Sequence, residues 1–142
     1  PRYGHAAAAA SGTVVVLGGN GGTTSASRYS PGAANAWAAL PNMTTPRAEF
    51  AAAALRGTTV FALGGMGHSK NEPIALASVE ALDLAAAPGA PLSLAWTRYP
   101  SMTTPRRNHA AAVRLVLRRP QLAGRREPLR RRWELLRRRR LR

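Results

Sequence analysis

Short apolar runs bounded by glycine, proline or polar residues recur along the 142-residue chain. Two of them are rich in β-branched residues, and each leads into a Gly-Gly pair: residues 13–17 (TVVVL) and residues 58–63 (TTVFAL). β-Branched and apolar side chains favour strands, and a glycine pair lets the backbone turn or pass close to a neighbour. The pattern therefore predicts two buried strands, each followed by a structural turn. The glycines of these turns are Gly18, Gly19, Gly64 and Gly65.

A weaker apolar pattern predicts four further short strands, because each run is bounded by turn residues. These strands are expected at residues 25–29, 37–40, 78–82 and 96–99, and the tryptophans Trp37 and Trp96 begin the second and the fourth.

The alanine runs at residues 5–10 and 50–55 are ambiguous. Alanine is the best helix former, so local propensity alone favours helices there. However, each run is short and lies between a Pro-Arg pair and a glycine-containing turn, and isolated helices of this length are marginal in water. We therefore predict two more strands, whose small side chains suit a crowded position.

An internal repeat organises these elements. The phrase PNMTTPR at residues 41–47 returns as PSMTTPR at residues 100–106, and Pro-Arg pairs occur at Pro1, Pro46 and Pro105. Each of the first two pairs begins the same series: an alanine run, a strand ending in Gly-Gly, a third strand, and a tryptophan strand. A repeat of this length indicates stacked units of one supersecondary type. The second unit is the longer one, and we place its surplus in loops around residues 69–77 and 85–94.

This order of motifs resembles the kelch repeat, each copy of which forms one blade of a β-propeller. The family pattern runs from Pro-Arg through two strands to Gly-Gly, then Ser-x-Glu-x-Tyr-Asp-Pro, Trp and Met. The resemblance covers residues 1–113 and has departures. Ser27 and Ser30 stand where the family prefers Glu and Asp, whereas the second unit keeps Glu80 and Asp83 but has Leu82 for Tyr.

The resemblance implies an all-β partial propeller of four-stranded antiparallel blades. The expected parts are blade 1 (1–45), blade 2 with loop insertions (46–104), the first strand of a third blade (105–113) and a basic low-complexity tail (114–142). Closing a ring takes four to eight blades. We therefore expect the chain, which starts at Pro1 without a methionine, to be a piece of a longer propeller or a truncated gene model.

The tail carries most of the charge. It holds 13 arginines and two glutamates, so it supplies +11 of the formal net charge of +15. One interpretation is a disordered or helical segment that binds phosphate backbones or an anionic surface. Another is a solvated tail in which like charges repel. A third is a frame or splice error, because arginine without lysine is typical of GC-rich DNA translated in the wrong frame.

Enzymatic and metal-binding motifs are missing from the sequence. The glycine turns lack the spacing of dinucleotide or phosphate loops. His5 and His109 occupy one repeat position, which Phe50 fills in the second unit, so this is expected to be a packing position. With no cysteine and no clustered acids, a transition-metal site has too few ligands. We therefore predict no catalytic residue, no metal and no cofactor.

The remaining polar candidates are repeat-structural arginines and one variable loop. Arg47 and Arg106 recur at the same position, which favours an internal bridge to a strand acid such as Glu80 or to loop carbonyls over contact with a ligand. Residues 67–77 differ most between the units, and loops on a rigid scaffold commonly carry recognition. The predicted partner-binding residues are His68, Ser69, Lys70, Asn71 and Glu72.

Three functions follow from these features. The resemblance implies a non-catalytic protein-interaction module, for example a substrate-recognition part of a larger adaptor such as a ubiquitin-ligase receptor with a BTB domain. The alternative is nucleic-acid or anionic-surface binding through residues 114–142. A galactose-oxidase-like enzyme fragment is less favoured, because that copper chemistry needs a Cys-linked tyrosine. Neither a signal peptide nor an apolar run of membrane-spanning length is seen, and together with the lack of cysteine this favours the cytoplasm.

Overall fold

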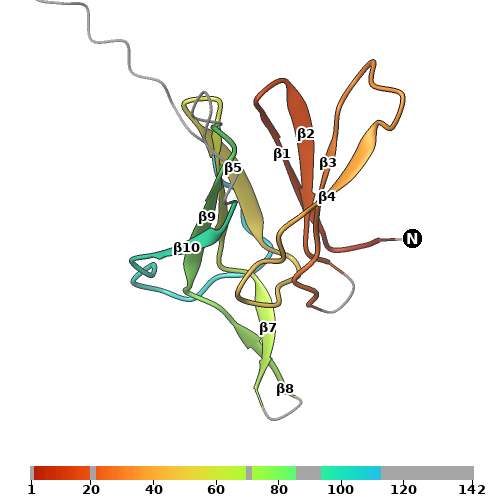
Figure 1. The fold of residues 1–142 in the computed structure, drawn as a ribbon. Helices are drawn as coiled ribbons and strands as arrows, with labels where there is room; N and C mark the ends of the chain where they lie inside the picture. The colour runs from red at the N-terminus through yellow and green to blue at the C-terminus, as the bar shows by residue number, and fades with distance from the viewer. Residues whose placement is uncertain (1, 20–21, 70–71, 86–93, 113–142) are drawn as a thin grey trace, which may run out of the picture.

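The fold is all-β throughout the part of the chain that the structure describes. A computed structural model describes residues 2–19, 22–69, 72–85 and 94–112. These ranges contain two four-stranded antiparallel sheets and one two-stranded hairpin (Figure 1). The strands are β1 (Ala6–Ala10), β2 (Thr13–Leu17), β3 (Ala26–Tyr29), β4 (Trp37–Leu40), β5 (Ala51–Leu55), β6 (Thr59–Leu63), β7 (Met66–Ser69), β8 (Glu72–Ala75), β9 (Val79–Asp83) and β10 (Trp96–Tyr99).

The first sheet, which we call blade 1, is a meander in which neighbours along the chain are neighbours in the sheet. Its order is β1-β2-β3-β4, with Ala6 opposite Leu17, Leu17 opposite Ala26, and Ala26 opposite Leu40. Side chains directly opposite one another share a face. These four therefore lie on one side of the blade.

The second sheet, blade 2, repeats this plan with one insertion. Its order is β10-β9-β6-β5, and the β7–β8 hairpin is inserted between β6 and β9. The two sheets have the same strand connections when the hairpin is left out. The architecture is therefore a partial, propeller-like arrangement of two blades.

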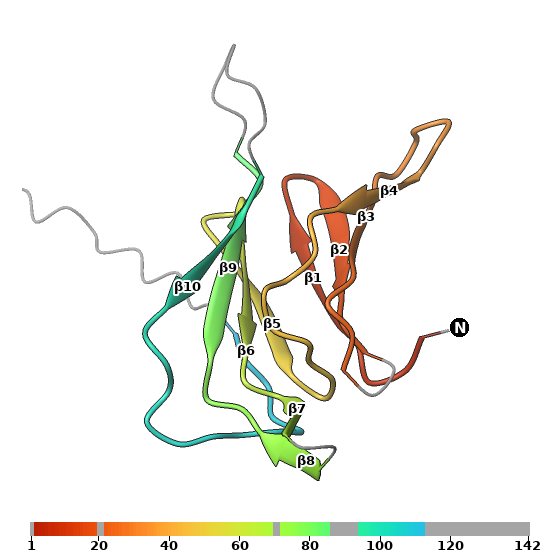
Figure 2. The same ribbon diagram turned by 60° about the horizontal axis from the view of Figure 1, so that its bottom comes forward.

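Both alanine runs are strands, as predicted against local helix propensity. β1 pairs with β2 along its whole length, and β5 pairs in the same way with β6. The two alanine strands also lie next to each other where the blades meet (Figure 2). Small side chains allow this close approach of two sheets, so tertiary packing overrides the helical preference.

The hydrophobic core lies between the two blades. From the first blade and its exit come residues that include Val15, Leu17 and Met43, and from the second come Val60 and Leu82. All five are at most 3% exposed. Because one cluster contains side chains from both sheets, neither blade buries its inner face without the other.

Two features differ from the sequence prediction. Residues 67–77 were expected to be loop, but β7 (Met66–Ser69) and β8 (Glu72–Ala75) pair there as an antiparallel hairpin. Residues 105–112 were expected to begin the first strand of a third unit, but the structure has no strand in them. A strand needs a neighbour for its hydrogen bonds, and a second strand for that unit would have to follow Val113, which lies outside the described residues together with the tail (114–142).

Candidate functional site

The most elaborate part of the structure is the end where the two blades are joined, which we call the linker end. It comprises residues 2–4, 22–25, 41–49 and 100–108 and the β7–β8 hairpin at the bottom of Figure 1. The hairpin is anchored here, because Ala48 and Met66 exchange backbone hydrogen bonds of 3.0 and 2.7 Å.

Each Gly-Gly pair is crossed by the backbone of the next repeat. Gly19 N–H donates to Arg47 O at 3.0 Å, and Gly65 N–H donates to Arg106 O at 2.7 Å. The preceding glycine has no room for a side chain: a Cβ on Gly64 would lie 2.7 Å from Arg106 O. Its φ of +60° is also a left-handed conformation that favours glycine. The glycine pairs are therefore required where one repeat is joined to the next.

Arg47 is buried inside this junction. Its side chain is 0% exposed. Its Nη1 donates to Gly64 O at 2.6 Å and to Ser78 O at 3.2 Å, and its Nη2 donates to Ser78 Oγ at 3.1 Å. The guanidinium also lies 6.0 Å from the centre of the Phe50 ring. These contacts fix the turn after β6 against the start of β9.

The carboxylate of Glu80 completes the junction. Its Oε1 lies 2.8 Å from Nη2 of Arg47 and accepts a bond of 3.2 Å from Thr45 N–H. Its Oε2 accepts from both the N–H and the hydroxyl of Thr44, at 2.7 and 2.8 Å. The bridge between Arg47 and a strand acid is thus present, and it holds the inter-blade linker from inside the protein.

Arg106 has the same repeat position but a different environment. It is exposed, and within the described part of the chain no side-chain hydrogen bond or ion pair of Arg106 is seen. Its counterpart of Glu80 would belong to the third strand of a third unit. The two arginines therefore differ because only Arg47 has a complete blade after it among the described residues.

A second set of equivalent repeat positions lies shortly before β1, shortly before β5 and after β10. Gly4, Glu49 and Asn108 all have left-handed backbones, with φ of 62°, 53° and 52°. Glu49 N–H donates to Gly4 O at 2.8 Å, and Asn108 N–H donates to Glu49 O at 2.9 Å. This ladder was not predicted from the sequence, although the constant offset from each Pro-Arg pair marks the three residues as equivalent.

Three of the five predicted partner-binding residues are described, and they lie on the hairpin. His68, Ser69 and Glu72 are exposed, whereas Lys70 and Asn71 lie outside the described residues. Exposure continues along β8, where Ile74 is 41% exposed. The hairpin projects away from both sheets in Figures 1 and 2, so one edge of β8 has no strand beside it among the described residues.

The histidines are not brought together. His5 and His68 are exposed, and the ring nitrogens of His109 are buried without a hydrogen-bond partner in the described part of the chain. The His109 ring packs against Gly64, as the Phe50 ring packs against Gly18. The expectation of a shared packing position holds for these two residues. It is wrong for the exposed His5, which has no preceding Gly-Gly pair to pack against among the described residues. In the described ranges no group of three or more potential ligands is placed to hold a metal ion.

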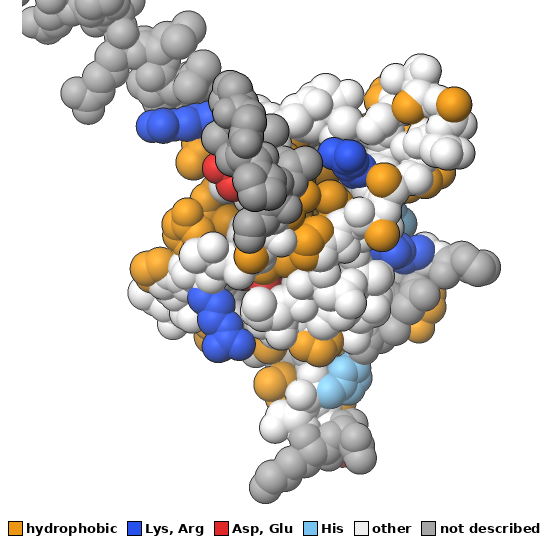
Figure 3. All heavy atoms as spheres, in the orientation of Figure 1, with side chains coloured by type: hydrophobic (Ala, Val, Ile, Leu, Met, Phe, Trp, Pro, Cys, Tyr) orange, Lys and Arg blue, Asp and Glu red, His pale blue; other side chains and the backbone are white. Residues whose placement is uncertain are grey.

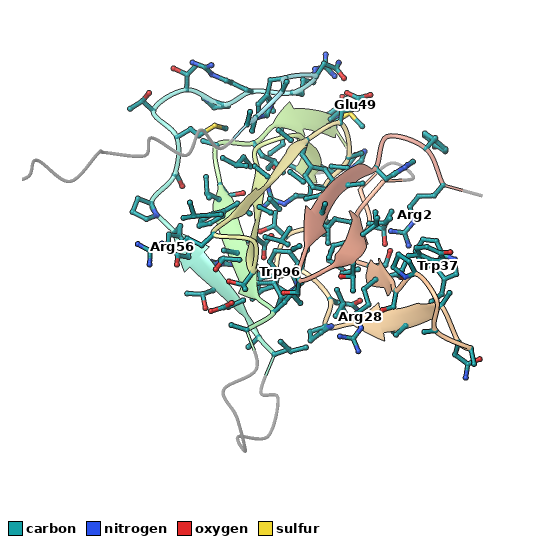
Figure 4. All side chains as sticks on the ribbon, turned by 90° about the horizontal axis from the view of Figure 1, so that it is seen from above. Arg2, Arg28, Trp37, Glu49, Arg56 and Trp96 are labelled. Atoms are coloured by element: carbon teal, nitrogen blue, oxygen red, sulfur yellow. The ribbon has the colours of Figure 1, made fainter. Side chains whose placement is uncertain are left out.

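The two repeat tryptophans also have different environments. The indole N–H of Trp96 donates to Pro41 O at 2.8 Å, and its side chain lies between the blades (Figure 4). Trp37 lies on the outer side of blade 1 and is 59% exposed, with its ring 5.2 Å from that of Tyr29. The difference again follows from the neighbouring blade, which only Trp96 has.

Comparison with known proteins identifies the architecture. A scan of protein-family models found no match, and no curated protein matched the sequence. Among solved structures, YjhT superposes with a TM-score of 0.66 and 18% sequence identity over 80% of this chain. The match covers 32% of YjhT, so the chain spans about a third of that protein's length. At this identity the similarity is one of fold, and it agrees with a partial propeller-like structure.

Membrane crossing by helices has no support in the described residues. None of them belongs to a helix that is long and apolar enough to span a bilayer.

Proposed function

We propose that this chain is a non-catalytic protein-interaction module of the kelch type, and that it binds its partner through the linker end. The observation that carries the proposal is the β7–β8 hairpin. It is the large structural difference between the two repeats, and the exposed His68, Ser69 and Glu72 lie at its tip. A contact that is specific to one blade is expected where the repeats differ.

The hairpin combines a fixed base with an exposed tip. The base of the hairpin is fixed by two backbone hydrogen bonds between Met66 and Ala48, and the linker beside it is fixed by Glu80. A projecting strand pair on such a base loses little conformational freedom when it binds. Recognition through elements supported by a rigid scaffold is a common arrangement.

The proposed setting is a larger adaptor, such as a ubiquitin-ligase receptor, in which further blades, from a longer chain or from other copies of this one, complete the propeller. This part of the proposal rests on the order of the repeat motifs. The buried charged groups of the junction suit a supporting role beneath an interaction surface, since Arg47 and Glu80 form hydrogen bonds with each other and with the backbone.

The test is a comparison of matched variants in quantitative capture from a cell extract. The double variant His68→Ala with Glu72→Ala is expected to lose specific partners that the original chain retains. The control, Arg56→Ala, changes an exposed residue in the turn between β5 and β6, at the end of β6 away from the hairpin, and is expected to retain them. Equal capture by all three chains would contradict the proposal.

The same experiment separates the alternative function. Binding through the arginine-rich residues 114–142 would be insensitive to the hairpin variant, and it would decline steeply with salt and with nuclease treatment. Partners lost on hairpin substitution but stable to both treatments support the interaction module.

A further inference from the structure

One face of blade 1, which we call its free face, is exposed. The face of blade 2 at the same repeat positions is buried. Trp37 lies opposite Tyr29, as Trp96 lies opposite Leu82. Yet Trp37 is 59% exposed and Trp96 is 8% exposed.

The free face of blade 1 is apolar. Cross-strand pairing places its members on one side of the sheet: Ala7, Ala9, Val14, Val16, Tyr29 and Trp37. The equivalent positions of blade 2 pack against blade 1: Ala52, Ala54, Val60, Ala62, Leu82 and Trp96.

Blade 2 has the complementary face, which is only partly free, since Val79 and Ala81 on it are 8% and 3% exposed. Phe61 and Tyr99 lie there with ring centres 5.1 Å apart, at the repeat positions of Val15 and Leu40 in the buried face of blade 1. Tyr99 is 45% exposed and borders an open hollow of about 300 Å³ that Ala81 and other residues of blade 2 line. Figure 3 shows hydrophobic side chains at the surface over this blade.

We propose that the free face of blade 1 binds the complementary face of blade 2 in a second copy of this chain. Each chain has one face of each kind, and the contact between blades 1 and 2 shows how the two kinds pack. In this arrangement the indole N–H of Trp37 donates to Pro100 O of the second copy, as Trp96 donates to Pro41 O. The segment PSMTTPR thus offers to Trp37 of another copy the proline carbonyl that PNMTTPR offers to Trp96.

Residues 105–112 must leave their place for this contact to form. They form no strand, and backbone hydrogen bonds attach them to the turn after β6 and to the inter-blade linker, including Gly65 N–H to Arg106 O and Asn108 N–H to Glu49 O. Arg2 and Gly4 of the second copy have the repeat positions of Arg106 and Asn108. The carbonyl of that Arg2 and the N–H of that Gly4 therefore replace both bonds.

The exchange conserves these hydrogen bonds and adds burial of two apolar faces. Because one kind of face meets the other, the contact is head to tail rather than two-fold symmetric. It gives a ring if the rotation closes and a linear assembly if it does not.

The experiment is native mass spectrometry and light scattering of the full 142-residue chain, in salt that screens the arginine-rich segment. The original chain is expected to assemble beyond the monomer in a concentration-dependent way. Trp37→Glu and Tyr99→Glu are each expected to be monomeric, since each breaks one of the two faces. Ile74→Glu, a similar change on the hairpin, is expected to leave assembly unaltered.

Mixing the two monomeric variants gives the decisive result. One intact face remains on each, so an equal mixture is expected to form a heterodimer and no larger species. Circular dichroism like that of the original chain verifies that both variants are folded. A monomeric original chain, a mixture that stays monomeric, or assembly that survives Tyr99→Glu would each overturn the proposal, the last because it indicates a symmetric Trp37 contact.

Discussion

The guanidinium of Arg47 and the carboxylate of Glu80 meet 2.8 Å apart, at 0% and 1% exposure, and together they hold the linker between two sheets. The pair joins two separate segments, since Arg47 belongs to PNMTTPR and Glu80 lies in β9. Desolvating two charges is unfavourable, so such a pair is stable only when additional hydrogen bonds satisfy the remaining polar atoms. Thr44 and Thr45 supply those bonds to Glu80.

Replacing Glu80 by glutamine is therefore expected to be severe. The variant Glu80→Gln keeps the size of the side chain but leaves the Arg47 charge buried without a counter-charge, which costs about 3 kcal/mol or more of unfolding free energy. Urea unfolding measures the change. The exposed Glu72→Gln is the control and is expected to alter stability by less than about 0.5 kcal/mol. Equal stabilities for the two variants would show that the buried pair contributes nothing.

A methyl group at Gly64 is expected to damage the junction between repeats. The variant Gly64→Ala forces a left-handed backbone onto alanine, at a cost of about 1–2 kcal/mol, and also places its Cβ against Arg106 O. Gly57→Ala shares the left-handed φ, at 74°, but a Cβ there meets nothing within 4 Å. Thermal unfolding should place Gly64→Ala well below Gly57→Ala. Similar melting temperatures would argue against close approach as the reason for the glycine pair.

The tryptophans offer a matched pair of substitutions. Trp96→Phe removes the bond to Pro41 O and part of the inter-blade packing, so we expect a loss of about 1–3 kcal/mol. In dilute solution, where a chain has no second copy to contact, Trp37→Phe is expected to change little because that ring is mostly exposed. Denaturant unfolding of both variants at low protein concentration checks the difference. An equal loss for both would indicate that the bond to Pro41 is unimportant.

Blade 1 lacks the acid of the junction, and restoring it is expected to be mildly favourable. Ser27 has the repeat position of Glu80, and Arg2 already donates to Gly18 O at 3.3 Å, as Arg47 donates to Gly64 O. Ser27→Glu should therefore give Arg2 a partner. Because Arg2 is partly exposed, solvent screening limits the gain to about 0.5 kcal/mol.

A double-mutant cycle tests the gain from Ser27→Glu. The stabilisation should vanish when Arg2→Ala is also present, since the interaction belongs to the two side chains together. A gain that persists without Arg2 would assign it to some other contact of the new carboxylate.

The repeat made most of the fold predictable from the sequence. All eight blade strands lie within one or two residues of their predicted positions, including the alanine strands, whose location between Pro-Arg and a glycine turn outweighed local propensity. The β7–β8 hairpin was missed because Met66-Gly67-His68-Ser69 has no strict alternation, and because Pro73 in the second strand is typical of a loop or a sheet edge.

Environment was less predictable than structure. Trp37 and Trp96 share one repeat position, and Arg47 and Arg106 share another, so the repeat pattern alone does not distinguish a buried member from an exposed one. The distinction depends on whether a blade packs beside the residue in space. The ladder through Gly4, Glu49 and Asn108 was missed for a related reason, because it uses backbone atoms and leaves the side-chain identity free to vary.

The long sequence separation of the linker's contacts has a consequence for the order of folding. Blade 1 is built from neighbouring strands, so its pairings form early as the chain is synthesised. The linker at residues 41–47 is expected to become ordered later, because its hydrogen bonds to Glu80 span 35 and 36 residues and the hydrogen bond from Trp96 to Pro41 spans 55. During synthesis the strands of blade 1 are therefore present before the contacts that hold residues 41–47. Those residues become fixed only when β9 and β10 have been made.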